Sequence, residues 1–260
     1  MEVKSHVQMP KGLMKAFSHP TKDGKCVYYL DLKDMEIKEA KINELGTIRG
    51  LYDPKSEEML DHLYESPFFQ VTQDIKKFYR GKSEVFSLTQ ENVKALKDFL
   101  TISLMRSDAT RELAASKSIL ASIFPESLYK YFVPAMQMAL PNIPLLDGLH
   151  INFLLNGSKL PLVAPRNCVV FSFIKSLGSY ILPINPYCAI LFQAEELYLS
   201  TFNKDGEVCY AFVKEGEEKT IRLINFAAGK SERATNNEFL IGKNREELEI
   251  LKRDLSGEQK

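Results

Sequence analysis

The chain has 260 residues, 45% of them hydrophobic and 26% charged, which is typical of a soluble globular protein with a sizeable core. Lys plus Arg and Asp plus Glu each number 34, so the zero net charge excludes long-range attraction to nucleic acid or to an anionic membrane. Any such contact must come from a local patch of charge.

The cysteines predict a reducing compartment. No two of them form a CxxC pair, which disfavours a structural zinc site. Each lies in an apolar or aromatic run that is typical of a strand, and these four residues are Cys26, Cys168, Cys188 and Cys209. We therefore expect buried, reduced thiols and a cytoplasmic protein.

Neither a signal peptide nor a membrane-spanning segment is predicted. The opening MEVKSHVQ lacks the apolar segment of a signal peptide. The most apolar stretch, residues 131–146, is interrupted by three prolines and is too short to cross a bilayer. We expect no membrane partner.

The N-terminal part is predicted to begin with an apolar arm and a β-hairpin. In the arm, Val7, Met9, Leu13 and Phe17 predict a strand or turn segment that docks on the core and positions His6. Residues 26–32 and 35–42 then alternate in polarity and flank Lys33-Asp34, which favours two paired strands.

A helical region is predicted to follow. A short helix over 56–65 should end before Pro67, and Ser66 should cap a second, amphipathic helix over 66–79. Ser87 or Thr89 should cap a stronger helix that runs to about Arg106. Further helices are expected over about 113–123 and 125–140.

The C-terminal half is predicted to be a sheet followed by helices. Short β-branched and aromatic runs are separated by Gly, Pro and Asn, and they span 150–155, 160–164, 168–174, 180–184 and 188–193. A helix over 217–234, an extended piece at 239–242 and a terminal helix follow. In the terminal helix, Asn244 and Glu247 match a capping box.

This order predicts an α+β fold: an N-terminal β-hairpin, a central helical region, and an antiparallel sheet in the C-terminal half with flanking helices. One domain over 1–260 is the simplest organisation. The alternative is two lobes, with hairpin and helices over about 1–145 and sheet with C-terminal helices over about 146–260.

The sequence contains none of the common catalytic signatures. It lacks a P-loop, a GxGxxG turn, HExxH, GxSxG and an EF-hand loop, which removes the commonest nucleotide, zinc-protease and esterase hypotheses. No two histidines are spaced as ligands on one helix face. We expect no metal site and no cofactor.

Four residues are candidates for catalysis. His6 is a proton-transfer candidate near neutral pH. Arg106 and Arg111 follow a long apolar helix face and could clamp a phosphate or carboxylate, while Glu65 could assist. The competing interpretation, which we favour for the arginines, is that they cap the helix and pair with nearby acidic residues, Asp108 and Glu112.

Arg166 and Asn167 form a second candidate site. They are a polar pair between apolar runs, in LVAPRNCVVF. A buried arginine there would need a carboxylate partner or would face a ligand, so the two residues are candidate ligand-binding groups.

The chain resembles a bacterial domain family of unknown function whose members open with His-x-Val-Pro-x-x-x-Leu-x-x-Phe. The likeness is carried by six short segments: HVQMPKGLMKAF, the 26–42 hairpin, GLYD, HLYES, LMRSDATRE and PINPYCAILF. Met9-Pro10 replaces the family's Val-Pro, and the Ser-Asp-Asn-Pro turn is here Pro165-Arg166-Asn167-Cys168. The resemblance implies a fold and a bacterial cytosolic setting but no reaction.

Three functional hypotheses follow. The first is a phosphodiester hydrolase of the defence or toxin type, in which His6 is the acid or base, Arg106 and Arg111 stabilise phosphate charge, and Glu65 assists. The second, at least equal in weight, is a non-catalytic protein-interaction module. The third is a small-ligand binding protein that uses Arg166 and Asn167. A nucleic acid, another protein or a second copy of the chain remain open as partners.

Overall fold

The computed structural model describes residues 4–6, 9–49, 54–82, 88–106, 149–171, 180–193, 210–234 and 239–257. The chain divides into two compact units. The first comprises residues 1–10 and 46–148, and the second comprises residues 11–45 and 149–260.

The first unit combines a small strand pair with helices. Strand β1 (Lys4–His6) pairs antiparallel with β5 (Thr47–Arg49), which places the backbone of His6 opposite Thr47. The helices are α2 (Pro54–Leu60), α3 (Ser66–Lys77) and α4 (Gln90–Met105), with π-helical turns η1 (Asp61–Glu65) and η2 (Phe78–Lys82).

Segments α2, η1, α3 and η2 follow one another without a break, so the expected end before Pro67 is wrong. The Ser66 N–H donates to the Asp61 carbonyl, which closes a π turn and leaves Ser66 inside the helix instead of capping it. A π turn already interrupts the α-helical hydrogen-bond ladder. Pro67, which has no N–H to donate, is tolerated next to that interruption.

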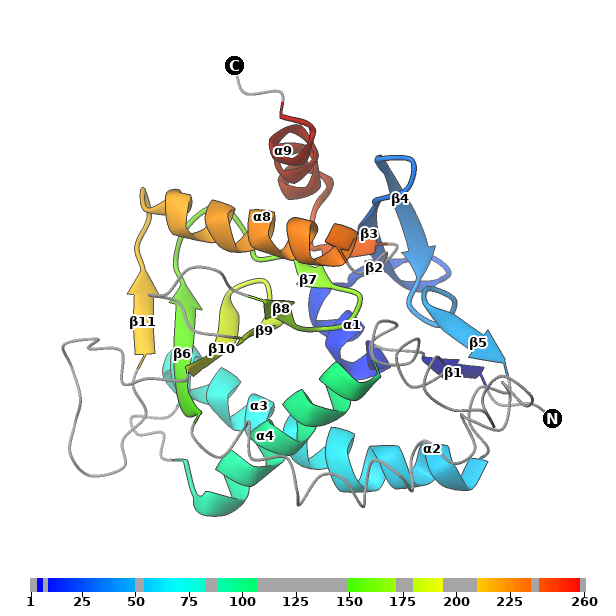
Figure 1. Ribbon diagram of the computed structural model, residues 1–260, viewed down its shortest axis with the longest axis vertical. Helices are drawn as coiled ribbons and strands as arrows, with labels where there is room; N and C mark the ends of the chain where they lie inside the picture. Colours follow the sequence, from blue (N-terminus) through cyan, green and yellow to red (C-terminus); the bar gives the residue numbers. More distant parts are fainter. Residues whose placement is uncertain are drawn as a thin grey trace. The chain divides into compact units, whose positions relative to one another are not determined.

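Helix α4 matches its prediction and packs on α3, as Figure 1 shows. The Thr89 side chain caps it by accepting from the Asn92 N–H at 3.1 Å, and the helix ends at Met105 with Arg106 as its C-cap. Between the two helices, the rings of Phe68 and Phe99 stack with centroids 3.7 Å apart. This aromatic contact anchors the pair.

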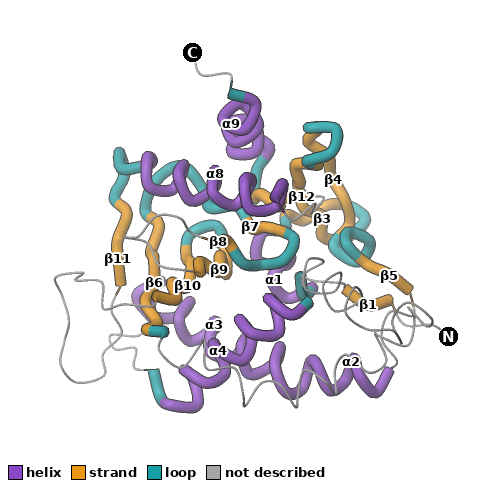
Figure 2. The backbone as a smooth tube through the Cα atoms, viewed as in Figure 1, coloured by secondary structure: helices purple, strands orange, loops and turns teal. Residues whose placement is uncertain are grey.

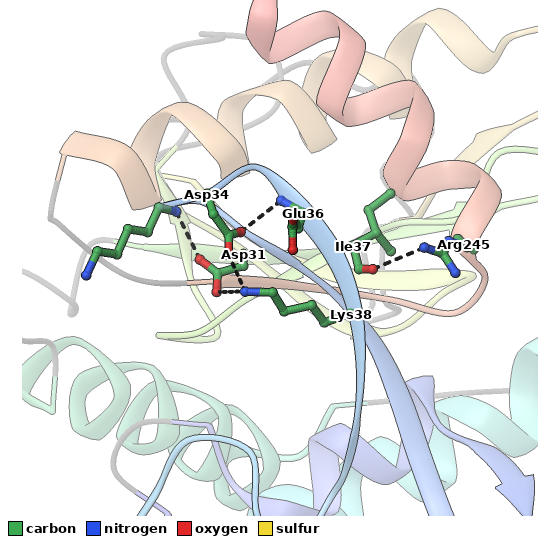
Figure 3. Close-up of polar contacts among 7 residues, drawn as sticks. Asp31, Asp34, Glu36, Ile37, Lys38 and Arg245 are labelled. Carbon is green, nitrogen blue, oxygen red and sulfur yellow. Dashed lines mark hydrogen bonds and ion pairs between the residues drawn. The ribbon is translucent and has the colours of Figure 1, made fainter.

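In the second unit, the predicted hairpin is confirmed as β3 (Gly24–Asp31) and β4 (Glu36–Lys41), extended by β2 (His19–Thr21). Lys38 donates to both Asp31 and Asp34 across the hairpin (Figure 3). The hydrogen bond from Lys38 lowers the pKa of Asp34, and these two carboxylates raise the pKa of Lys38. The charged turn is thereby fixed.

The hairpin belongs to the same sheet as C-terminal segments. Strand β12 (Phe239–Gly242) pairs antiparallel with β3 on one side and with β7 (Ala164–Pro165) on the other. Residues more than 200 positions apart, such as Tyr29 and Ile241, therefore lie opposite one another.

The second sheet has the order β11 (Tyr210–Val213), β6 (His150–Asn156), β10 (Cys188–Gln193), β9 (Tyr180–Asn185) and β8 (Val170–Phe171). Its pairs are antiparallel except for β11 with β6, which are parallel. Strands β8 and β9, which overlap the predicted runs 168–174 and 180–184, form one of the antiparallel pairs.

Helix α8 (Glu218–Ala234) packs against strands of both sheets, and α9 (Arg245–Ser256) packs against α8, as Figure 2 shows, and against strand β3. Leu154 and Leu191 of the sheet belong to one buried cluster with Ile224 of α8 and Leu251 of α9. The predicted cap of α9 is present, since the Glu247 carboxylate accepts from the Asn244 N–H at 2.6 Å.

Three further local predictions are wrong. The apolar arm contains helix α1 (Lys11–Phe17) where a strand or turn was expected, because Leu13, Met14 and Phe17 share one helix face and are buried together. Cys168 does not lie in a strand but follows the turn after β7, with φ of 68°. The run 160–163 is buried but forms no strand.

The fold is α+β, as predicted. None of the helices in the described ranges is both long and apolar enough to cross a membrane. Three of the cysteines are described, and each of these is buried and free of disulfide bonds: Cys26, Cys168 and Cys188.

Candidate functional site around Glu65 and Arg106

The structure joins two of the four candidate catalytic residues. An Nη1 hydrogen of Arg106 is donated to Glu65 Oε1 at an N–O distance of 2.9 Å. The arginine side chain is 2% exposed, whereas the glutamate side chain is 18% exposed. The cation is thus enclosed, whereas part of the glutamate side chain is exposed to solvent.

The ends of two helical segments bring Glu65 and Arg106 into contact. Glu65 is the last residue of the π turn η1, and Arg106 is the C-cap of α4, where its N–H donates to the Ile102 carbonyl at 2.9 Å. A cation at a helix C-terminus is also favoured by the helix dipole. The capping role expected for Arg106 is therefore present, and Asp108 and Glu112 lie outside the described residues.

The two members of the pair differ in their exposure to solvent, and this difference decides which of them can take part in a reaction. Because its guanidinium is buried, Arg106 is placed to orient Glu65 and not to meet a ligand from solvent. An ion pair orients a carboxylate, and a positioned carboxylate at the edge of solvent can accept a proton or a hydrogen bond. π turns within helices often occur at functional sites.

The other two candidates are only partly defined. His6 belongs by its backbone to β1 in the same unit, but its side chain lies outside the described residues. Arg111 also lies outside them.

Arg166 and Asn167 form a turn in the second unit. The Cys168 N–H donates to the Pro165 carbonyl at 2.9 Å, and Asn167 Oδ1 accepts from the Val169 N–H at the same distance. Asn167 is 2% exposed. The guanidinium of Arg166 lies 5.8 Å from the centre of the Phe239 ring. The side-chain oxygen of Asn167 therefore already accepts a hydrogen bond that stabilises the turn.

The sequence did not reveal two polar arrangements of the second unit. His19 Nε2 lies 2.6 Å from Glu39 Oε1, and the imidazole stacks on Tyr28 with centroids 4.4 Å apart. Asn152 donates to Gln193 within the buried sheet. Only strand pairing brings these residues together, so no motif in the chain could have signalled them.

Within the described ranges, no group of three or more His, Cys, Asp or Glu side chains is placed to hold a metal ion. Comparisons with protein-family models, curated proteins and solved structures gave no match.

Proposed function

We propose that the protein is a phosphodiester hydrolase whose active site lies in the helical unit around Glu65. The observation that carries the proposal is the ion pair that a buried arginine makes with a partly exposed glutamate. His6, Glu65 and Arg106 also belong to the same compact unit.

The residues would divide the chemistry as follows. Glu65 takes a proton from the attacking water, and Arg106 is a positioning residue that fixes the carboxylate. His6 protonates the leaving oxygen, and Arg111 contacts the phosphate, since Arg106 is enclosed.

Hydrolysis of bis(p-nitrophenyl) phosphate and of labelled DNA and RNA, with and without Mg²⁺ or Mn²⁺, tests this proposal. Glu65→Gln keeps the shape but cannot accept the proton, so we expect a loss of about 100-fold or more. Glu58→Gln, an exposed carboxylate on α2, is the matched control and should keep full activity. An inactive wild-type chain, or a folded Glu65→Gln variant with full activity, would overturn it.

A cytoplasmic, bacterial setting and a role in defence remain parts of this proposal. The buried, unbridged state of Cys26, Cys168 and Cys188 supports a reducing compartment.

A second candidate is a non-catalytic interaction module that binds another copy of the chain. Tyr210 and Phe212 project from one face of β11 and are 49% and 55% exposed. Exposed neighbouring aromatics are enriched at protein interfaces. If this candidate holds, light scattering gives a dimer mass for the wild type and a monomer mass for Phe212→Ser, while a monomeric wild type overturns it.

A further inference from the structure

One face of the long helix in the first unit carries an unusual row of side chains. Positions 4, 7 and 11 after Glu65 lie on nearly the same side of α3, and position 15 follows about one turn later, within the π turn η2. They are Phe69, Thr72, Lys76 and Arg80. The row runs from a carboxylate past an aromatic ring to two cations.

The exposure of these side chains to solvent increases from Phe69 toward Arg80. Phe69 and Thr72 are half-buried, with the Phe69 ring near Phe99 of α4, and Lys76 and Arg80 are exposed. Neither cation forms an ion pair with a described residue, whereas the adjacent Lys77 binds Asp74 at 2.8 Å. The two cations are therefore available to an anionic partner, while Lys77 is already neutralised.

The distances fit an extended polyanion. At about 1.5 Å per residue, Lys76 lies roughly 16 Å along α3 from Glu65, and Arg80 lies about one turn further, in the π turn η2. Single-strand binding surfaces combine a row of cations for the phosphates with aromatic rings for the bases. Phe69, a half-buried ring that also contacts Phe68 and Phe99, lies between Glu65 and the cations, where a base could meet its exposed part.

We infer that a single nucleic-acid strand lies along the face formed by Glu65, Phe69, Lys76 and Arg80, with its phosphates on the two cations. The inference rests on the proposed function, because it names the substrate that Glu65 would cleave. The zero net charge of the chain is compatible with it, since binding then depends on this local row.

Fluorescence anisotropy of labelled oligothymidylate tests the inference. The Glu65→Gln full-length chain serves as the background, so that binding is measured without cleavage. Each phosphate contact on a single strand contributes about 0.7 to the slope of log K against log salt. Lys76→Ala and Arg80→Ala should each lower that slope by about 0.7 and weaken binding about fivefold near 0.1 M salt.

Lys77→Ala is the matched control, since it removes a neighbouring lysine that is already paired. It should change neither slope nor affinity. Equal weakening by Lys77→Ala, equal binding of duplex, or equal binding of polyglutamate or of phosphatidylserine vesicles would overturn the inference.

The outcomes also separate this inference from the proposed function. If the wild-type chain cleaves no substrate but binding still depends on Lys76 and Arg80, the nucleic-acid surface is supported and the hydrolase proposal is refuted. If Lys76→Ala and Arg80→Ala cleave as fast as the wild type, the hydrolase proposal is supported and the nucleic-acid surface is refuted.

Discussion

Arg106 and Glu65 are 41 positions apart in sequence and form an ion pair at 2.9 Å between the end of α4 and the π turn η1. The arginine is almost fully enclosed. Burial of a charge is costly unless a partner compensates it, so each member of the pair depends on the other. The pair fixes how the two helices meet, whatever reaction the site performs.

We expect Arg106→Met to lower the free energy of unfolding by about 3 kcal/mol, because it leaves the Glu65 carboxylate without its buried counter-charge. Combining it with Glu65→Gln should recover part of that loss. Urea unfolding of the two single variants and the double variant measures the coupling. Strictly additive effects would show that the two side chains do not stabilise each other.

Local patterns predicted the local elements. Alternating polarity revealed the β3–β4 hairpin, and Thr89 and Asn244 marked two helix starts, because these signals need only near neighbours. Pro67 was misinterpreted since a π turn, which has no sequence signal, removes the conflict that proline normally causes.

Long-range pairing was beyond sequence reasoning. The insertion of β12 between β3 and β7 depends on the register of Leu240 against Leu30, which no local pattern encodes. For the same reason, Glu65 and Arg106 were named as separate candidates, but their contact was not predicted. The sequence suggested the residue types of the site and left their geometry open.

Asn225 should be important for stability although it lies far from the candidate site in sequence. Its Nδ2 donates to the Pro161 carbonyl, and its Oδ1 accepts from the Val163 N–H, each at 2.9 Å. Asn225→Leu orphans both buried backbone groups and should cost about 2–4 kcal/mol in the free energy of unfolding. Asn225→Asp keeps an acceptor for Val163 and is the informative comparison in chemical denaturation. Wild-type stability of the Leu variant would contradict this role.

Cys188 is expected to be unreactive in the folded chain. It is fully enclosed within β10, and desolvation raises the pKa of its thiol. Since the thiolate is the reactive form, iodoacetamide should leave Cys188 unmodified until denaturant is added. Peptide mass spectrometry after alkylation with and without guanidinium measures the fraction of Cys188 that is modified. Rapid alkylation under native conditions would mean that this part of the sheet opens readily.

Glu247 is expected to lower the free energy of unfolding as the pH rises. Its side chain is 2% exposed, and desolvation by burial raises the pKa of its carboxyl above the ordinary value of 4.5, despite the hydrogen bond from the Asn244 N–H. The folded state therefore holds this proton more tightly than the unfolded state does, and the contribution to stability is lost as the pH rises from 4.5 through the folded pKa. Glu247→Gln, which keeps an acceptor for the cap, should gain stability relative to wild type over that rise. Urea unfolding of both proteins across this range measures the difference, and a difference that is constant with pH would refute the assignment.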